Sequence, residues 1–525
     1  MRSFATRRSS PTTWLASGLA SLLLGPVAAQ TTSEPELPDI GPPAPVPAEA
    51  PPGTADIDRH DLRRHVYWLA DDARGGRYTG SAGQQATAEY VAAQFQTLGL
   101  EPLGDRGTYL QHYPLERLEL DASTGLVYGD EKVTDGFAVL HASEKDKLSL
   151  RGRFVACGNG APEQVPDKLK GRIPLVVLDG AAGDGGTGGD LRAVQRYVAI
   201  SKVLDRAGAS GGVVCLLDDG GSLANTLNYR GLLADHAQLA FDQPKRPLVH
   251  VPLLVLSAAR SRPLLQHVGL MDTDGRLVPD ADIDKQSGRL TIRVKQVKKA
   301  TASNVVAVLE GGGRKSEAIV FSAHHDHVGT RLDGDCFNGA DDNASGTATL
   351  LEIAQAFAAA GERPERSIVF LSVSGEELGL WGSAWFAEHP TWPLSRIVAD
   401  VNIDMVGRAG SRDGKILMQV TPSHGHDEYS TLVRDGVALG ERFGIAFTSG
   451  DQYYQRSDHF NFAKNGVPVV FFCDGEHPDY HRVTDSADRL DYAAMEAIAR
   501  LAYWTGRRAA DAKGRPDRLG KQPGW

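Results

Sequence analysis

Residues Ala318–His327 read AIVFSAHHDH, and this stretch decides the fold. The small and apolar residues up to Ala323 have the length and composition of a buried β-strand. Three histidines and an aspartate follow directly, where such a strand would end. A segment with helical spacing of apolar residues, 344–360, comes next along the chain. A buried strand that leads into an amphipathic helix predicts a sheet with helices packed on its faces.

The same alternation continues towards the C-terminus. Further strands are expected over 367–373, 397–403 and 467–472, and further helices over 378–388, 428–443 and 492–510. Strands that alternate with helices predict an α/β fold with a mostly parallel sheet flanked by helices. In such sheets, functional sites form beyond the carboxyl ends of the strands.

Polar residues gather just after these expected strands. The clusters are His324-His325-Asp326, Asp341-Asp342-Asn343, Glu376-Glu377, Asp404 and Tyr480-His481. Together they contain imidazoles and carboxylates that could hold metal ions, and one further glutamate that could take a proton from water. The clusters therefore indicate a hydrolytic metal site.

Each cluster also has an ordinary structural interpretation. Asp342 could cap the following helix, and the Glu376-Glu377 pair could be a solvated pair at a helix start. His459 and His477 compete with His481. The position of the clusters in the series favours metal: a carboxylate can bridge two ions, and one of two adjacent glutamates can hold metal while the other holds water. If His324 is a ligand, Asp326 can accept from its other ring nitrogen.

The chain divides into segments of different composition. Residues 1–29 have the arginines, apolar run and small-residue cleavage site of a secretory signal, and an uncleaved anchor is the rival interpretation. Residues 30–55 are expected to be a disordered linker. Strand-like stretches between Gly/Asp-rich turns predict a smaller β-rich domain over 119–299, inserted into a main domain formed by 56–118 and 300–512. Residues 513–525 form a C-terminal tail.

Length and charge narrow the possible functions. A chain of 525 residues is too long for one simple core. Its net charge of −10 offers no basic footprint, so nucleic acid is not expected as a partner. The apolar run near the N-terminus is too short to predict a stable membrane anchor. The four cysteines would form either two disulfides, Cys157–Cys215 and Cys336–Cys473, or buried free thiols.

Beyond the clusters themselves, the sequence resembles a known family, the co-catalytic two-zinc aminopeptidases, whose superfamily includes glutamate carboxypeptidase and the transferrin receptor. The likeness covers roughly 56–118 and 300–510. It rests on the segments Ala323–Gly329, Asn338–Gly346, Ser374–Ser383, Asn402–Gly407 and Tyr480-His481, supported by Gly76–Ser81 and Arg456–His459. The insert resembles a protease-associated domain.

The resemblance implies a zinc exopeptidase-like fold and two Zn²⁺ ions. One zinc would be held by His324 and Asp404, the other by Glu377 and His481, with Asp342 bridging them. Glu376 would be the general base, and Tyr480 would hydrogen-bond the developing oxyanion. Zinc would lower the pKa of the attacking water.

These expectations lead to an exported enzyme, periplasmic or secreted, that releases N-terminal amino acids from peptides. A carboxypeptidase or dipeptidase on the same fold is the first alternative, and Arg408 or Arg456 would then supply the cation that binds a free carboxylate. A receptor-like module without activity is the second, and the full ligand set argues against it. The sequence leaves the oligomeric state open.

Overall fold

The computed structural model describes residues 39–142, 146–179, 189–218, 237–239, 249–278 and 281–524. The predicted signal segment, 1–29, lies outside this range. Two compact units are present, Met1–Gly41 and Pro42–Trp525, and the helices and strands of the described residues lie in the second. Among the described residues, no helix combines the length and apolar composition that a membrane crossing requires.

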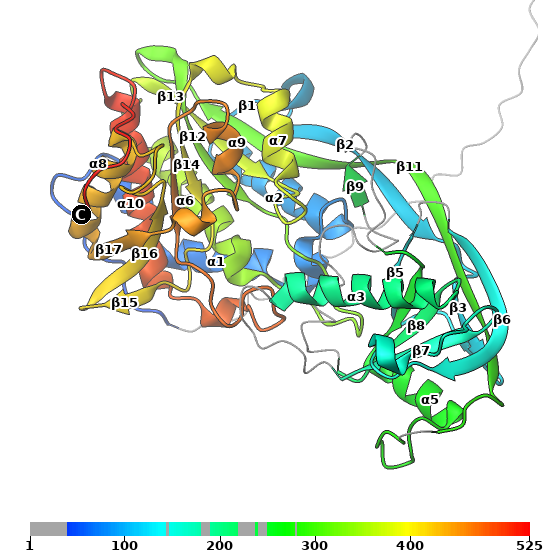
Figure 1. The fold of residues 1–525 in the computed structure, drawn as a ribbon. Coiled ribbons are helices and arrows are strands. Elements are labelled where there is room, and N and C mark those ends of the chain that lie inside the picture. The colour runs from blue at the N-terminus through cyan, green and yellow to red at the C-terminus, as the bar shows by residue number, and fades with distance from the viewer. Residues whose placement is uncertain are drawn as a thin grey trace, which may run out of the picture. The chain divides into compact units, whose positions relative to one another are not determined.

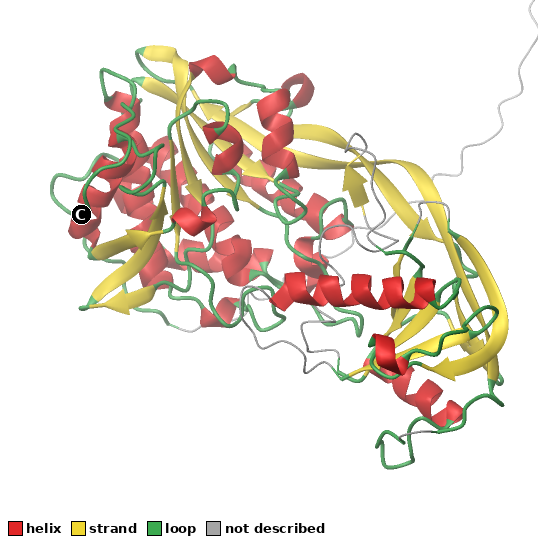
Figure 2. Cartoon of the chain, viewed as in Figure 1, coloured by secondary structure: helices red, strands yellow, loops and turns green. Residues whose placement is uncertain are grey.

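The main domain is built on a mixed sheet (Figures 1 and 2). Its four central strands run parallel, in the order β13–β12–β14–β18. Antiparallel neighbours extend both sides, β11 beside β13 and β16 beside β18. The strands are β1 Glu101–Pro102, β2 Leu110–Leu120, β11 Ser287–Leu309, β12 Arg314–His324, β13 Arg366–Val373, β14 Ile397–Ile403, β15 Gly410–Arg412, β16 Lys415–Thr421, β17 Ile445–Ser449 and β18 Val469–Cys473. The predicted α/β class is confirmed.

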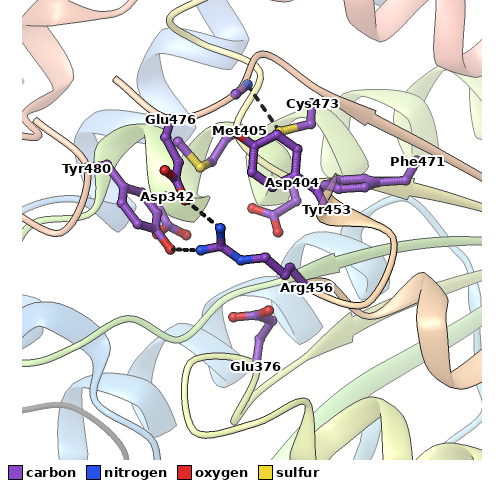
Figure 3. A pocket seen from close by; sticks show the side chains of 11 residues that line it. Asp342, Glu376, Asp404, Met405, Tyr453, Arg456, Phe471, Cys473, Glu476 and Tyr480 are labelled. Carbon is purple, nitrogen blue, oxygen red and sulfur yellow. Dashed lines mark hydrogen bonds and ion pairs between the residues drawn. The ribbon is translucent and has the colours of Figure 1, made fainter. Parts of the chain in front are cut away.

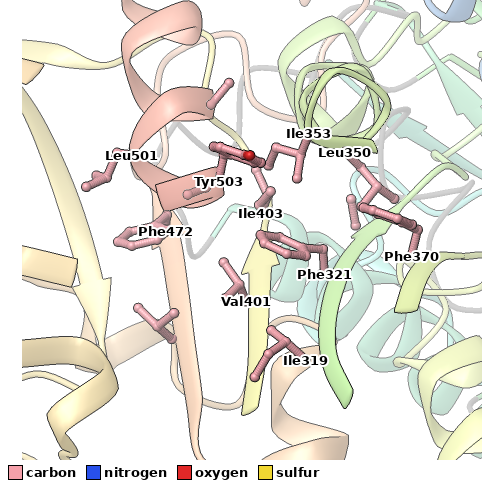
Figure 4. Close-up of a cluster of buried hydrophobic side chains, with 14 of the residues drawn as sticks. Ile319, Phe321, Leu350, Ile353, Phe370, Val401, Ile403, Phe472, Leu501 and Tyr503 are labelled. Carbon is pink, nitrogen blue, oxygen red and sulfur yellow. The ribbon is translucent and has the colours of Figure 1, made fainter. Parts of the chain in front are cut away.

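Helices cover both faces of this sheet because successive strand residues point to opposite sides. Ile319 and Phe321 pack into one core with residues of α2, α6 and α10 (Figure 4). Ala318 and Val320 pack into another core with Phe386 of α7 and with residues of α9. The helices are α1 Arg59–Leu69, α2 Ala82–Thr97, α6 Gly346–Ala359, α7 Trp381–Glu388, α8 Thr431–Gly440, α9 His459–Ala463 and α10 Tyr492–Asp511.

The chain enters and leaves the insert through one antiparallel pair, β2 and β11. The domain boundaries expected at 119 and 299 fall within these two strands. Strands β3, β4 and β6 form an antiparallel layer with β11, and β7, β8 and β10 run parallel beside β6. Two helices cover this β-rich region. The elements are β3 Gly125–Tyr128, β4 Glu131–Val133, β5 Phe137–Leu140, β6 Lys147–Ala156, β7 Ile173–Leu178, α3 Gly189–Arg206, β8 Gly212–Leu216, β9 Ala237–Leu239, β10 Leu253–Leu256 and α5 Ala258–Val268.

The part of the expected linker after Gly41 is not disordered but lies along the C-terminal helix. The amide of Ala44 donates to Glu496 over 2.9 Å, and Arg500 donates to the Ala44 carbonyl over 2.7 Å. Gly53 has a φ of 92°, and a Cβ there would lie 2.1 Å from the Ala356 carbonyl oxygen. Hydrogen bonds to buried charges of α10, remote in sequence, therefore order this segment.

The four cysteines are buried free thiols, which decides between the two alternatives left by the sequence. Cys157 and Cys215 lie in the insert, and Cys336 and Cys473 lie in the main domain.

Candidate metal centre

The central strands bring the polar clusters to one edge of the sheet. His324 is the last residue of β12, and Asp404 is the first residue after β14. Glu376 and Glu377 follow β13, and His481 follows β18. Because these strands are parallel neighbours, their carboxyl ends meet at the same edge.

Asp342 reaches this edge from the turn that precedes α6, Ala340–Ser345. Gly339, just before the turn, has a φ of 55°, and a Cβ there would lie 2.4 Å from the ring of His327. Glycine is therefore required where the chain passes the histidine cluster.

Asp342 connects two groups of potential ligands. In the first group, His324 Nε2 lies 3.2 Å from Asp404 Oδ1 and 3.3 Å from Asp342 Oδ1. In the second, His481 Nε2 lies 2.9 Å from Asp342 Oδ2 and 3.2 Å from Glu377 Oε2. The ligand atoms within each group lie within 4.8 Å of one another. The five residues assigned to metal by the sequence thus come together, and Asp342 turns one oxygen to each group.

His327 is a member of the second group that sequence reasoning missed. Its Nδ1 lies 2.6 Å from Glu377 Oε1 and 3.9 Å from Asp342 Oδ2. Its Nε2 is buried and has no hydrogen-bond partner among the described residues. The available signal was its place in the AHHDH stretch, three residues after His324.

The two adjacent glutamates differ in their surroundings. Glu377 lies between two histidines: burial and Asp342 act to raise its pKa, but His481 and His327 outweigh them and lower it to about 2. Glu376 approaches a single histidine, with Oε2 4.0 Å from His324 Nε2. Burial raises the pKa of Glu376 well above its usual range, and Glu377 and Asp404 add to this effect against the opposing field of His324. The surroundings of the two adjacent carboxyl groups thus shift their pKa values in opposite directions, as expected when one is a ligand and the other an acid or base.

In the first group, too, the pKa values of His324 and Asp342 are shifted by their neighbours. Burial lowers the pKa of His324, but Asp404 and Glu376 outweigh it and raise that pKa well above the usual value. Burial raises the pKa of Asp342, but hydrogen bonds from His324 and His481 bring it well below the usual value. The carboxylates of the centre thus stabilise a positive charge placed between them.

Residues outside the two groups hold the ligands in place. His324 Nδ1 lies 3.3 Å from the backbone carbonyl oxygen of Asp326 and 3.6 Å from its Oδ1, and Thr79 donates to Asp326 Oδ2 over 2.7 Å. Ser457 donates to Asp404 Oδ2 over 2.7 Å and receives a hydrogen bond from Asn402. Sequence reasoning missed Thr79 and Ser457 as supports, although both lie in segments that it singled out.

Arg77 is a further support that joins the N-terminal part of the main domain to the centre. Its guanidinium is fully buried and donates to the carbonyls of His325, Asn338 and Gly339, each over 2.6–2.9 Å. These three carbonyls flank the histidine cluster and the Asp342 turn, so one side chain fixes both segments.

A pocket opens beside the centre, with Asp342, Glu376 and Asp404 in its wall (Figure 3). Met405 and Phe471 contribute apolar surface. The remaining lining residues are Tyr453, Arg456, Cys473, Gly475, Glu476 and Tyr480.

The two arginines expected to bind substrate differ in position. Arg456 lines the pocket, donates to Glu476 over 2.6 Å and lies 3.5 Å from the Tyr480 hydroxyl (Figure 3). Arg408 does not line it: its guanidinium donates to Asp479 over 2.9 Å. Arg408 therefore holds the loop before Tyr480, and its predicted role in binding substrate is not supported.

The donor set fits zinc. His324, Asp342, Glu377, Asp404 and His481 are each at most 7% exposed. Buried carboxylates are costly unless a cation or hydrogen bonds compensate them, and the imidazoles present are neutral donors when they bind metal. Histidine nitrogen and carboxylate oxygen in groups of three or four are typical zinc ligands. His327 adds a further imidazole, whose Nδ1 faces Glu377 and Asp342 of the second group.

Comparison with known proteins finds a family model that matches the part of the chain that carries this centre. Residues 304–505 match Peptidase family M28. Aminopeptidase YwaD of Bacillus subtilis is 25% identical over 266 residues, which cover 49% of this chain and 54% of that protein. Probable glutamate carboxypeptidase AMP1 of Arabidopsis thaliana is 25% identical over 499 residues, covering 84% of this chain and 65% of that protein. The chain thus spans between about half and two-thirds of the length of these curated relatives.

Solved structures share the fold. The structure of BSAP, a zinc aminopeptidase from Bacillus subtilis, aligns with a TM-score of 0.58 at 19% identity, over 89% of this chain and 98% of that one. A Peptidase M28 precursor from Shewanella amazonensis aligns with a TM-score of 0.52 at 17% identity, over 89% and 100%. The resemblance predicted from the sequence is confirmed.

Proposed function

Because the chain carries a Peptidase family M28 domain over residues 304–505, we propose that it is a two-zinc exopeptidase that releases N-terminal amino acids from peptides. One observation carries the proposal: Asp342 turns its two carboxylate oxygens to two separate ligand groups. A single carboxylate placed between two ligand sets is the arrangement that two-metal hydrolytic sites need.

The proposed ligands follow from the two groups. His324 and Asp404 hold one zinc, and Glu377 and His481 hold the other, with Asp342 shared. His327 stands beside the second ion, where it either completes the coordination or holds Glu377 by the contact of 2.6 Å. When bound, the two ions supply Lewis acidity that lowers the pKa of a water and polarises a carbonyl.

The protein's own residues move the protons. Glu376 lines the pocket, and unlike Glu377, which lies between two histidines, it approaches only His324. Its carboxylate accepts a proton from the water and passes it to the leaving amine. The Tyr480 hydroxyl faces the same pocket and donates to the oxygen that becomes negative as the carbonyl is attacked. Its ring stacks on His481 with a centroid separation of 3.8 Å, which fixes the direction of the hydroxyl.

The charge of the pocket favours an amino end over a carboxyl end. A carboxypeptidase needs a cation that is available for a free carboxylate. In this pocket the Arg456 guanidinium is paired with Glu476, whose side chain is 8% exposed. Apart from Glu476, the other charged wall residues are Asp342, Glu376 and Asp404, which are assigned to the zinc ions and the water, so this pocket offers a free carboxylate no unpaired cationic side chain.

Substrate panels with blocked ends test this proposal. The protein should hydrolyse aminoacyl-arylamides and carboxyl-blocked dipeptides, and should leave amino-blocked dipeptides intact. A chelator should abolish the activity, and added zinc should restore it. Hydrolysis of amino-blocked dipeptides only would instead establish a carboxypeptidase, and no hydrolysis by the zinc-loaded protein would establish a module without activity.

We propose, too, that the enzyme acts outside the cytoplasm, periplasmic or secreted. The support is the composition of residues 1–29, with arginines before an apolar run and Val27-Ala28-Ala29 before Gln30. The mature protein should begin near Gln30. An intact Met1 in a cytosolic fraction, found by N-terminal sequencing, would contradict export.

A further inference from the structure

One exposed face of the insert carries a concentration of positive charge. The face belongs to the antiparallel layer β4–β3–β11–β6. Figure 1 labels three of these strands, β3, β6 and β11. Lys132 pairs with Val127, Val127 with Arg289, and Arg289 with Arg151, so these four residues form one row across four strands. All four are exposed. The row therefore presents three cations and one apolar side chain to solvent.

More cations extend this face along the strands. Alternate residues of a strand share a face, so Lys147 and Arg153 of β6 and Arg293 of β11 lie on the same side as the row. The residues between them on this side are uncharged: Ser149, Ser287 and Thr291. We call the cations Lys132, Lys147, Arg151, Arg153, Arg289 and Arg293 the basic face.

The sheet itself gains nothing from this arrangement. Arg289 lies directly opposite Arg151, and Arg293 lies directly opposite Lys147. Like charges at directly opposed positions destabilise an antiparallel pair. Within the described residues, Lys132, Arg151, Arg153 and Arg289 take part in no ion pair, whereas Arg172 and Arg260 elsewhere in the insert each pair with an aspartate. Asp121 lies near Arg293 and partly balances the far end of the face.

The chain as a whole has the opposite charge, with a net value of −10. A basic face on an acidic protein orients the protein toward an anionic partner, because the remaining surface repels the same anions that this face attracts. Its cations are mostly arginines, whose planar guanidinium groups bind phosphate oxygens in pairs.

We propose that the basic face binds the peptidase to the surface of a membrane that contains anionic phospholipids. The occupant follows from the shape as well as the charge. The cations lie on three of the four strands, β4, β11 and β6, and spread in two dimensions. This spread matches an extended layer of phosphate headgroups better than a single linear chain. Val127, 38% exposed at the centre of the row, offers an apolar contact between headgroups. Binding of this kind is peripheral and reversible.

A hollow of about 510 Å³ adjoins the row and strengthens the inference. Arg151, Lys285 and Arg289 lie in its wall with His267 and Ser287. A headgroup phosphate that enters it would meet several donors at once. The hollow shares Val127, Arg151 and Arg289 with the row, so a recess for phosphate adjoins the plane of the face.

Vesicle sedimentation tests the proposal with the full-length mature protein. Vesicles of phosphatidylcholine alone should not bind it, and vesicles that also contain phosphatidylglycerol should. Binding should weaken as salt is raised, since the contacts are exposed. Each cation near an anionic surface contributes about a fivefold factor to partitioning, so the double variant Arg151→Glu, Arg289→Glu should lose binding by at least about 25-fold. The double variant Lys202→Glu, Arg206→Glu, with the same change of charge on the exposed side of α3, should retain most of it.

Hydrolysis of a small aminoacyl-arylamide and circular dichroism should be the same for both variants, which shows that the insert variants fold. The proposal is overturned if phosphatidylglycerol vesicles do not bind, or if both double variants lose binding equally. Tight binding of a soluble polyanion such as heparin, without vesicle binding, would overturn it in favour of a polysaccharide partner. None of these outcomes depends on whether the substrate is an aminopeptide.

Discussion

The main domain and the insert place their charged side chains in opposite ways. In the main domain, carboxylates and imidazoles of five segments are buried together at one edge of the sheet. In the described part of the insert, no charged side chain is buried, and cations stand on an exposed strand face. Because burial of charge is costly without a counter-ion or hydrogen bonds, the first arrangement favours a bound cation and the second needs none. The difference assigns the chemistry to one part of the chain and surface contacts to the other.

Of the variants considered, removal of the carboxylate shared by the two ligand groups should have the largest effect on zinc content and activity. Asp342→Asn takes away the charge that faces both ligand groups, so both zinc ions should be lost and peptidase activity should fall to background. Zinc content by elemental analysis, measured alongside activity, checks the result.

Glu352→Gln is the matched control for that variant. Glu352 is a buried carboxyl group on α6, and burial raises its pKa to about 8. It therefore carries a proton at neutral pH, and an amide should replace it without loss of zinc. Retention of both ions by Asp342→Asn, or equal loss in the two variants, would remove the basis for a shared ligand.

Substitution of the two adjacent glutamates, one at a time, should distinguish the general base from the zinc ligand. Glu376→Gln keeps the size of the side chain but cannot accept a proton, so kcat should fall by roughly 10²–10⁴ while zinc content stays unchanged. Glu377→Gln should weaken the binding of one zinc, and added zinc should partly restore activity. If the first variant loses metal and the second keeps it, the two roles are exchanged.

His327→Gln should weaken metal binding less than Glu377→Gln does. The residue touches Glu377 and lies at the second group, so zinc affinity there should fall by about 10–100-fold, with kcat largely recovered at saturating zinc. His325→Gln is the control: His325 bonds to Gln84 and Ser372, and burial lowers its pKa to about 3. Zinc titration should distinguish the two, and an equal affinity in both variants would exclude His327 from the centre.

Removal of the insert should have the smallest effect on metal. A short turn that replaces residues 122–292 would close the β2–β11 pair as a hairpin, since Leu120 already faces Val294. Zinc content should be unchanged, although Leu332 of the main domain loses its contact with the core of the insert. A folded remainder without zinc would show that the insert supplies a ligand.

Much of the fold could be predicted from local sequence patterns. The expected helix 492–510 corresponds to α10, Tyr492–Asp511, and the expected strand 397–403 corresponds to β14. Periodicity of apolar residues suffices for such buried elements. The ordered segment at Ala44 was not predictable in this way, because its partners Glu496 and Arg500 are remote in sequence and its own composition is that of a linker.

The candidate centre was predictable where a strand end fixes a residue. His324 and Asp404 sit where β12 and β14 stop, so position made them candidates, and the family resemblance singled them out as ligands. His327 was missed because it lies beyond the strand end, and only the path of the chain around Gly339 turns it to Glu377. Arg408 and Arg456 looked alike in sequence, and only the three-dimensional partners, Asp479 and Glu476, distinguish them.

Anomalous diffraction at the zinc edge, from crystals of the zinc-loaded protein, tests the central claim most directly. Two peaks should appear on either side of Asp342, one beside His324 and Asp404 and the other beside Glu377 and His481. A single peak, or peaks that do not share Asp342 as a ligand, would contradict a two-zinc centre.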